Sequence, residues 1–116
     1  MSLFVNGRLG LLAAGALAVA LSCSARADEA GKIEIILKDH HFAPAESAAP
    51  AGKPLTLEVT NQDPTPAELE SKALRFEKIV PGGGKISLQV RPLTAGRYRY
   101  FDDYHESTTE GFLVVK

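Results

Sequence analysis

Short segments in which apolar and polar residues alternate recur along the chain from residue 32 onward. In residues 55–60 the apolar side chains stand at every second position, and residues 85–90 and 97–101 repeat this pattern. Side chains on a β-strand point alternately to opposite faces, so a period of two predicts strands with one buried side. Residues 32–37, a short apolar run, are interpreted as a further strand.

Proline and glycine punctuate these segments. Turn clusters at residues 50–54, 61–66, 81–84 and 92–96 combine residues that fix φ with residues that accept positive φ. Strands spaced in this way predict an all-β sandwich. Residues 66–74 are rich in helix formers, and both a helical turn and an irregular loop are consistent with them.

The first 27 residues differ from this β pattern. After Arg8 an apolar run of Leu, Ala, Gly and Val extends from residue 9 to 21, and small residues with an Ala-x-Ala end follow it up to Ala27. A membrane-spanning helix needs about 20 apolar residues, so a cleaved secretory signal peptide of residues 1–27 is predicted. The alternatives are a retained anchor and a lipid on Cys23, which stands in a weak match to a lipoprotein cleavage site.

Removal of residues 1–27 leaves a single domain over residues 28–116 with eleven basic and fourteen acidic residues, a net charge near −3. The only Cys and the only Met are lost with the leader, so the domain has neither a disulfide nor a thiolate metal site. Mild acidity argues against nucleic acid as a partner and favours a cation. The sequence contains neither a Walker phosphate loop nor a G-x-S-x-G nucleophile motif.

The end of the chain, residues 96–116, resembles the copper-binding hairpin of the cupredoxins, which follows the pattern G-x-Y-x-F/Y-x-C-x-x-H-x4-M. The residues that match are Gly96, Tyr98, Tyr100 and His105. Asp102 stands at the cysteine position and Glu110 near the methionine. The resemblance implies a cupredoxin-like Greek-key β-sandwich without a blue-copper cysteine. Thiolate and thioether ligands favour Cu(I), whereas carboxylate and imidazole suit harder, more oxidised ions.

Five segments together resemble the small periplasmic cupredoxin-like proteins of bacterial ferrous-iron uptake systems. They are residues 39–44, 50–63, 65–71, 77–78 and 104–106. In that family the pattern runs D-H-x-F-x-P, then T-P-E-E-F-E-S, then E-K and then E-F-H. In this chain Ala67 replaces the first glutamate of that pattern, and Asp103 and Tyr104 replace Glu and Phe. The resemblance implies a periplasmic location, with an inner-membrane iron permease and another periplasmic iron-binding protein as partners.

The histidines are the first candidate metal ligands. His40 and His41 are adjacent, so at most one of them enters a given site if the segment is extended. The family pattern selects His40. His105 occupies the cupredoxin histidine position, on the loop before the last strand.

Four carboxylates complete the predicted ligand set. Glu68 follows the strand at residues 55–60 by a loop of the length that carries the first histidine ligand in cupredoxins, and we predict that it replaces that histidine. Asp102 and Glu110 are candidates by alignment to the Cys and Met positions. An extended chain would put Asp103 rather than Asp102 on the His105 face, and both are kept because the loop is free to break the alternation.

A site of imidazoles and carboxylates stabilises Cu(II) or Fe(III) over Cu(I), because anionic oxygen lowers the potential of the couple. The sequence therefore predicts copper(II), iron or both as the bound metal. The predicted function is assistance to iron uptake, either by oxidation of Fe(II) or by transfer of iron to the permease. The alternatives are a non-catalytic periplasmic metal carrier and a metal-free interaction module of a membrane complex.

Overall fold

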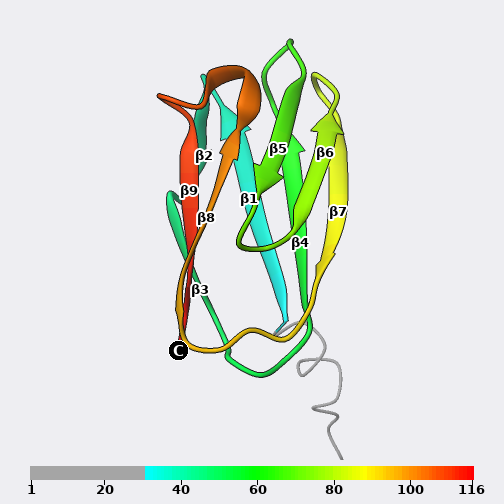
Figure 1. The fold of residues 1–116 in the computed structure, drawn as a ribbon. Coiled ribbons are helices and arrows are strands. Elements are labelled where there is room, and N and C mark those ends of the chain that lie inside the picture. The colour runs from blue at the N-terminus through cyan, green and yellow to red at the C-terminus, as the bar shows by residue number, and fades with distance from the viewer. Residues whose placement is uncertain (1–30) are drawn as a thin grey trace, which may run out of the picture.

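The computed structural model describes residues 31–116; the predicted signal peptide, with Cys23, lies outside the described residues. The described chain forms nine β-strands and one short 3-10 helix (Figure 1). In chain order they are β1 (Lys32–Lys38), β2 (His41–Ala43), β3 (Glu46–Ala49), β4 (Leu55–Asn61), β5 (Ala67–Ser71), β6 (Phe76–Val80), β7 (Lys85–Val90), β8 (Gly96–Asp102), η1 (Asp103–His105) and β9 (Glu110–Val115). No helix within residues 31–116 is long and apolar enough to cross a membrane.

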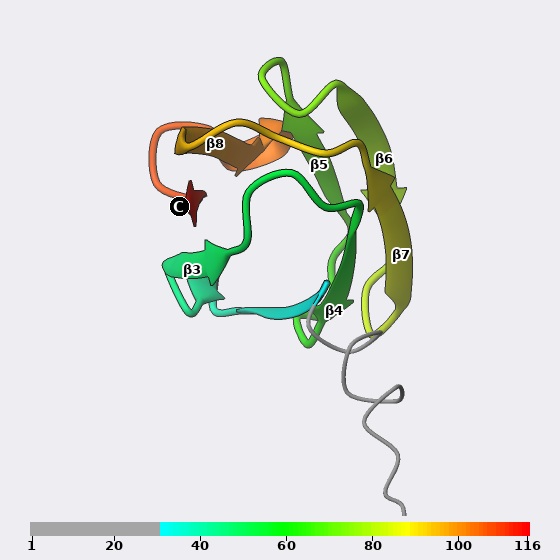
Figure 2. The ribbon, with the colours of Figure 1, turned by 90° about the horizontal axis from the view of Figure 1, so that it is seen from below.

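The strands form two sheets around one core. One sheet has the order β2-β1-β4-β7 and the other β3-β9-β8-β5-β6. β1 pairs with β4 and β3 pairs with β9 in parallel, whereas the other strand pairs are antiparallel. Figure 2, which looks along the strands, shows the two sheets wrapped around the interior. The all-β sandwich predicted from the sequence is confirmed.

The core is built from the alternating positions of the strands. Leu57 of β4 lies beside Ile33 of β1 and Leu88 of β7, and all three side chains are buried. The second sheet contributes the buried side chains of Leu69, Tyr100 and Leu113. Burial of an aliphatic side chain of this size contributes about 1.5–3 kcal/mol, so the alternation itself drives the packing of the two sheets.

Four strands predicted from the sequence correspond to β1, β4, β7 and β8, with ends within one residue of the prediction. The interpretation of residues 66–74 as a helical turn or loop was wrong. Ala67, Leu69 and Ser71 are buried at alternate positions of β5, which pairs with β6 on one side and β8 on the other. Pairing and burial here outweigh the helix propensity of the segment.

One end of the sandwich gathers the segments that carry the candidate ligands. β1, β4 and β8 all end there, at the top of Figure 1, together with the β1–β2 turn and η1. β1 begins and β9 ends at the opposite end. The chain thus enters and leaves the described domain far from these loops.

Candidate metal centre

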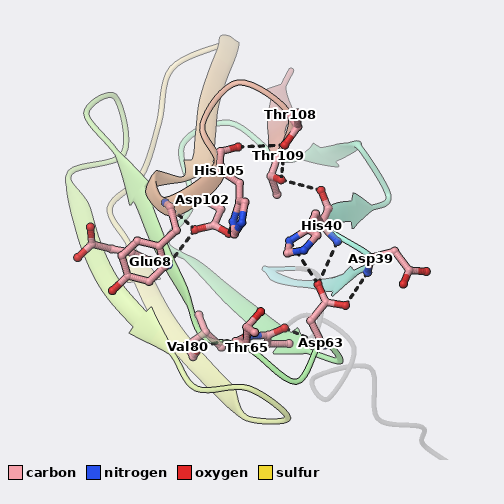
Figure 3. Close-up of polar contacts among 12 residues, drawn as sticks. Asp39, His40, Asp63, Thr65, Glu68, Val80, Asp102, His105, Thr108 and Thr109 are labelled. Atoms are coloured by element: carbon pink, nitrogen blue, oxygen red, sulfur yellow. Dashed lines mark hydrogen bonds and ion pairs between the residues drawn. The ribbon is translucent and has the colours of Figure 1, made fainter.

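Two histidines and one aspartate meet at this end of the sandwich. One ligand atom each from His40, Asp102 and His105 lies within 4.8 Å of the other two. The two imidazole rings have centroids 4.3 Å apart and planes inclined by 41°. Figure 3 shows the three side chains pointing toward one another from the β1–β2 turn, the end of β8 and η1. We call these residues the His–Asp–His group.

Asp102 and His105 are brought together by the change from strand to 3-10 helix. Asp102 is the last residue of β8 and the N-cap of η1, and its Oδ1 accepts a hydrogen bond of 3.0 Å from the Tyr104 N–H. The helical turn places His105 three residues later on the same side, with Nδ1 3.2 Å from Asp102 Oδ2. The loop therefore breaks the strand alternation, and Asp102 rather than Asp103 shares a face with His105.

The Asp102 carboxylate is buried and well provided with donors. Asp102 lies opposite Leu69 in the sheet register and faces inward, with 1% of its surface exposed. Its Oδ1 also accepts a hydrogen bond of 3.0 Å from the Glu68 N–H. A buried carboxylate without partners is costly, and here two backbone donors and one imidazole satisfy it.

His40 stands in a backbone conformation that glycine normally fills. The β1–β2 turn has two residues, Asp39 with φ 53° and His40 with φ 61°, between the paired residues Lys38 and His41. Positive φ at both central residues is the geometry of a type I′ turn, which favours glycine at the second of them. A left-handed non-glycine residue costs about 1–2 kcal/mol, so a retained histidine points to a use for its imidazole.

Several hydrogen bonds hold this turn. The N–H groups of Asp39 and His40 donate to the two carboxylate oxygens of Asp63, at 2.6 and 3.0 Å. The Thr109 hydroxyl donates to the His40 carbonyl at 2.7 Å. The pKa of Asp63 is held below its usual value, first by the His40 N–H and then, against partial burial, by the Asp39 N–H. Asp63 is therefore a fixed anion at the base of the turn.

The His–Asp–His group is open on one side. The side chains of His40 and His105 are 47% and 40% exposed, while Asp102 is buried. Imidazole nitrogens and a carboxylate oxygen form a donor set that suits Cu(II), Zn(II) or iron, not the soft Cu(I) ion. This arrangement fits an oxidised or divalent transition metal bound at the surface with room for further ligands. His41, which is exposed on β2, is not among the three residues that converge.

The structure does not bring Glu68 or Asp103 to the His–Asp–His group. Glu68 lies between buried Ala67 and Leu69 on β5 and so points away from the core, on the far side of Asp102 from His40 (Figure 3). Only the backbone N–H of Glu68 reaches the group, through Asp102. A loop position had been expected for Glu68, and its place in a strand is the reason for the difference.

Glu68, Glu70, Glu77 and Asp103 instead form what we call the outer acidic group. Glu70 lies opposite Glu77 in the register of β5 and β6. The pKa of Glu68 is raised by partial desolvation, then by Glu77 and Asp103. The pKa of Glu70 is raised by partial desolvation, then by Asp103 and Glu77. Desolvation and the neighbouring carboxylates thus make Glu68 and Glu70 harder to ionise.

Glu110 also lies apart from the His–Asp–His group. It is exposed at the start of β9, and its carboxylate accepts a hydrogen bond of 2.6 Å from Arg99 Nε. Glu106 lies 3.5 Å from the same guanidinium. Strand alternation turns Glu110 outward, because the neighbouring Gly111 is the residue that faces the core. Alignment to the methionine position alone did not reveal this orientation.

Sequence reasoning missed the residues that support His40. Asn61 and Asp63 belong to the predicted turn cluster at residues 61–66, and no sequence motif assigns a role to Thr109. The signal available was the Asn-Gln-Asp run after a strand, since Asx side chains commonly bind nearby backbone groups. Tyr100, on the inward side of the alternating segment 97–101, is fully buried in the core, and burial raises the pKa of its hydroxyl.

Comparison with known proteins identifies the family. Residues 11–115 match the family model of the Cupredoxin-like domain. The chain belongs to the cupredoxin-like domain family. The uncharacterized protein RP394 of Rickettsia prowazekii (strain Madrid E) is similar in sequence, with 37% identity over 84 residues, which cover 72% of this chain and 67% of that protein.

Solved structures show the same fold at low sequence identity. The metal binding domain of the Cu(I) exporting P-type ATPase CopA of Streptococcus pneumoniae D39, solved with Cu(I), has a TM-score of 0.65 and 16% identity over 73% of this chain and 84% of that one. Auracyanin A, a blue copper protein of Chloroflexus aurantiacus, has a TM-score of 0.62 and 17% identity, with 73% and 98% covered. A purple cupredoxin of Nitrosopumilus maritimus has a TM-score of 0.55 and 19% identity, with 72% and 99% covered. The cupredoxin-like fold predicted from the sequence is confirmed.

Proposed function

We propose that this cupredoxin-like protein binds one transition-metal ion, foremost Cu(II), through His40, Asp102 and His105. The observation that carries the proposal is the convergence of the three ligand atoms within 4.8 Å at one end of the sandwich. The left-handed backbone of His40 supports it, because a strained residue is retained where glycine would be easier. The copper proteins among the structural neighbours make copper a reasonable first choice.

The donor set tests whether copper fits. Residues 28–116 contain neither Cys nor Met, so a sulfur ligand of the kind that holds Cu(I) is unavailable within the predicted domain. Two imidazoles with a carboxylate suit Cu(II) and give a non-blue centre of low potential. Bound copper would supply a one-electron acceptor, while this chain supplies the ligands and the buried charge of Asp102 beneath them.

We propose further that the protein assists iron uptake in the periplasm, next to an inner-membrane iron permease and a second periplasmic iron-binding protein. The support is the sequence resemblance of residues 39–44, 65–71 and 104–106 to that family. Iron would be the substrate, and the outer acidic group on β5, β6 and η1 offers it carboxylate oxygens. Oxidation of Fe(II) to Fe(III) gives up one electron, so it needs a one-electron acceptor, which Cu(II) held by His40, Asp102 and His105 would supply.

A non-catalytic metal carrier is the second candidate. The exposure of His40 and His105, at 47% and 40%, favours it, because an ion bound at an open surface is readily passed to a partner. A carrier binds the ion stoichiometrically without turnover. Fe(II) oxidation assays on the copper-loaded protein separate the two: a rate above that of free Cu(II) supports oxidation, and an unchanged rate supports the carrier.

The binding proposal is tested by titration of the metal-free protein with Cu(II), followed by electron paramagnetic resonance. We expect one equivalent to bind with a non-blue spectrum and nitrogen hyperfine coupling. His40→Ala and His105→Ala should each abolish this signal, whereas Glu110→Ala, which alters a carboxylate already paired with Arg99, should leave it intact. If both histidine variants bind copper like the wild type, the His–Asp–His group is not the site.

A further inference from the structure

We propose that Asp63 and Thr109 are positioning residues that hold the His40 turn in its left-handed conformation, so that the imidazole already faces His105 before a metal binds. This inference rests on the proposed metal site. Asp63 and Thr109 are distant from His40 in sequence, and they are not metal ligands themselves. They determine the position of the His40 imidazole, which is a ligand.

The turn itself provides too little to fix His40. It consists of two residues, both with positive φ, and neither is glycine. A histidine returns easily from this region to the common β or α conformations, which would carry its ring away from His105. The observed approach of the two rings, 4.3 Å between centroids, therefore requires an external restraint on the backbone of residues 39 and 40.

Asp63 supplies the first restraint. One carboxylate oxygen accepts from the Asp39 N–H at 2.6 Å and the other from the His40 N–H at 3.0 Å, so both amides of the turn are fixed by a single side chain. Asp63 is itself held in place, because its own N–H donates to Asn61 Oδ1 at 2.9 Å. Asn61 is fully buried, and its Nδ2 donates to the Thr65 carbonyl at 2.8 Å. The restraint is thus anchored in the end of β4.

Thr109 supplies the second restraint and connects the two histidine loops. Its hydroxyl donates to the His40 carbonyl at 2.7 Å, and its N–H donates to the His105 carbonyl at 2.9 Å. Its carbonyl accepts from the Asp102 N–H at 3.0 Å. One fully buried residue therefore bonds to the backbone of every member of the His–Asp–His group. Figure 3 shows Thr109 next to the two histidines, with its hydroxyl bonded to the His40 carbonyl.

The first test compares copper affinity, measured by competition with a chelator, in the full chain and four variants. Asp63→Asn keeps the size of the side chain but presents only one acceptor oxygen, so we expect roughly tenfold weaker binding, as for other residues that orient metal ligands. Thr109→Val should weaken copper binding several-fold, whereas Thr109→Ser, which keeps the hydroxyl, should bind copper about as tightly as the wild type. Glu58→Gln is the control, because this β4 carboxylate pairs with Lys32 and Lys85 instead. If Asp63→Asn and Thr109→Val bind copper as tightly as the wild type, the positioning role is overturned.

The second test needs no metal, and it therefore separates failure of this inference from failure of the proposed function. His40→Gly removes the strain of the left-handed residue, so the metal-free variant should melt a few degrees above the wild type. Asp63→Asn should lower the melting temperature less in the His40→Gly background than in the wild type, because glycine holds the turn conformation unaided. An equal loss in the two backgrounds would show that Asp63 does not restrain His40. Failure of the wild type to bind copper, with a smaller loss in the glycine background, would overturn the metal site alone.

Discussion

The carboxylates of this protein fall into two groups that differ in what they face. Asp63 and Asp102 lie at strand ends inside the loop region, and each accepts two backbone N–H groups. The outer acidic group lies on η1 and on the side of β5 and β6 that faces away from the core. Its carboxylates stand next to one another. The two aspartates are held by hydrogen-bond donors, whereas desolvation and neighbouring carboxylates raise the pKa values of Glu68 and Glu70.

This contrast shows why acidic residues near a strand end are a poor guide to a metal site. An anion whose oxygens are engaged by the backbone has a fixed position, and it can orient an imidazole or share a metal with it. Carboxylates that repel one another on a sheet surface gain from any nearby cation without defining its position. Asp102 belongs to the first kind and Glu68 to the second, although the two residues are joined by a hydrogen bond.

The largest effect is expected from removal of an inner carboxylate. Asp102→Ala leaves the part-buried N–H groups of Glu68 and Tyr104 without their acceptor and removes the hydrogen-bond partner of His105. We expect a loss of about 2–4 kcal/mol in the free energy of unfolding, together with loss of copper binding. Urea denaturation and copper titration measure the two effects. Asp103→Ala, the adjacent exposed aspartate, is the matched control, and an equal loss of stability in both variants would remove the distinction between the groups.

The outer glutamates and Asp63 should change the stability in opposite directions as the pH falls. The folded-state pKa values of Glu68 and Glu70 are raised above the ordinary value of 4.5, so the folded state takes up protons more readily than the unfolded state. Their destabilisation, present at neutral pH, is relieved as the pH falls through the raised pKa values toward 4.5. The pKa of Asp63 is lowered from 3.8, so its stabilisation is complete above that value and is lost only below it.

Thermal melting of the metal-free protein between pH 7.5 and pH 3 checks this expectation. The contribution of the outer acidic group is isolated by the double variant Glu68→Gln, Glu70→Gln, in which the gain on mild acidification should be reduced while the loss in strong acid persists. A double variant with the same acid gain as the wild type would show that these two glutamates do not titrate as described.

A smaller effect is expected from a single change within the outer acidic group. Glu70→Gln removes one of two like charges that stand opposite each other on β5 and β6, so the melting temperature at pH 7 should rise by a few degrees. Differential scanning calorimetry measures the change. Glu34→Gln, on the exposed face of β1, is a control in which no such rise is expected. A fall in stability on Glu70→Gln would mean that a cation, not a like charge, is the dominant neighbour.

The smallest effect should come from Glu110. Its pair with Arg99 is exposed on both sides, so Glu110→Gln should cost less than about 1 kcal/mol of stability and leave copper affinity unchanged. Copper titration and urea denaturation of Glu110→Gln beside the wild type check both expectations. Weaker copper binding by this variant would restore Glu110 as a ligand and join the two groups of carboxylates into one site.

Much of the fold could be predicted because it depends on local pattern. Alternation at Leu55, Leu57 and Val59 marks a strand whatever its neighbours are. β5 was missed because its strand character depends on pairing with β6 and β8, which the residues of the segment do not encode. In such cases helix propensity gives the wrong structure.

The candidate site was predicted only in part, because some of it depends on local pattern and the rest on contacts that the pattern does not reveal. His40 and His105 were found from motif positions, but the choice between Asp102 and Asp103 depended on whether the chain stays extended after β8. The answer comes from the N-cap bond of Asp102, a contact between backbone and side chain that strand alternation does not reveal. The place of Glu68 outside the His–Asp–His group did not follow from the sequence, because spacing measures the length of a loop, not the face on which a side chain emerges.

The two ends of the described domain lie at the same end of the sandwich, opposite the His–Asp–His group, because β1 begins and β9 ends there. β1, with its seven residues, spans about 23 Å between that end and the His40 turn. A tether, a tag or a solid support joined at either end would therefore leave the histidine surface uncovered. Because both termini of the described domain lie opposite the histidines, a partner is able to approach the histidines from solution or from a neighbouring membrane protein.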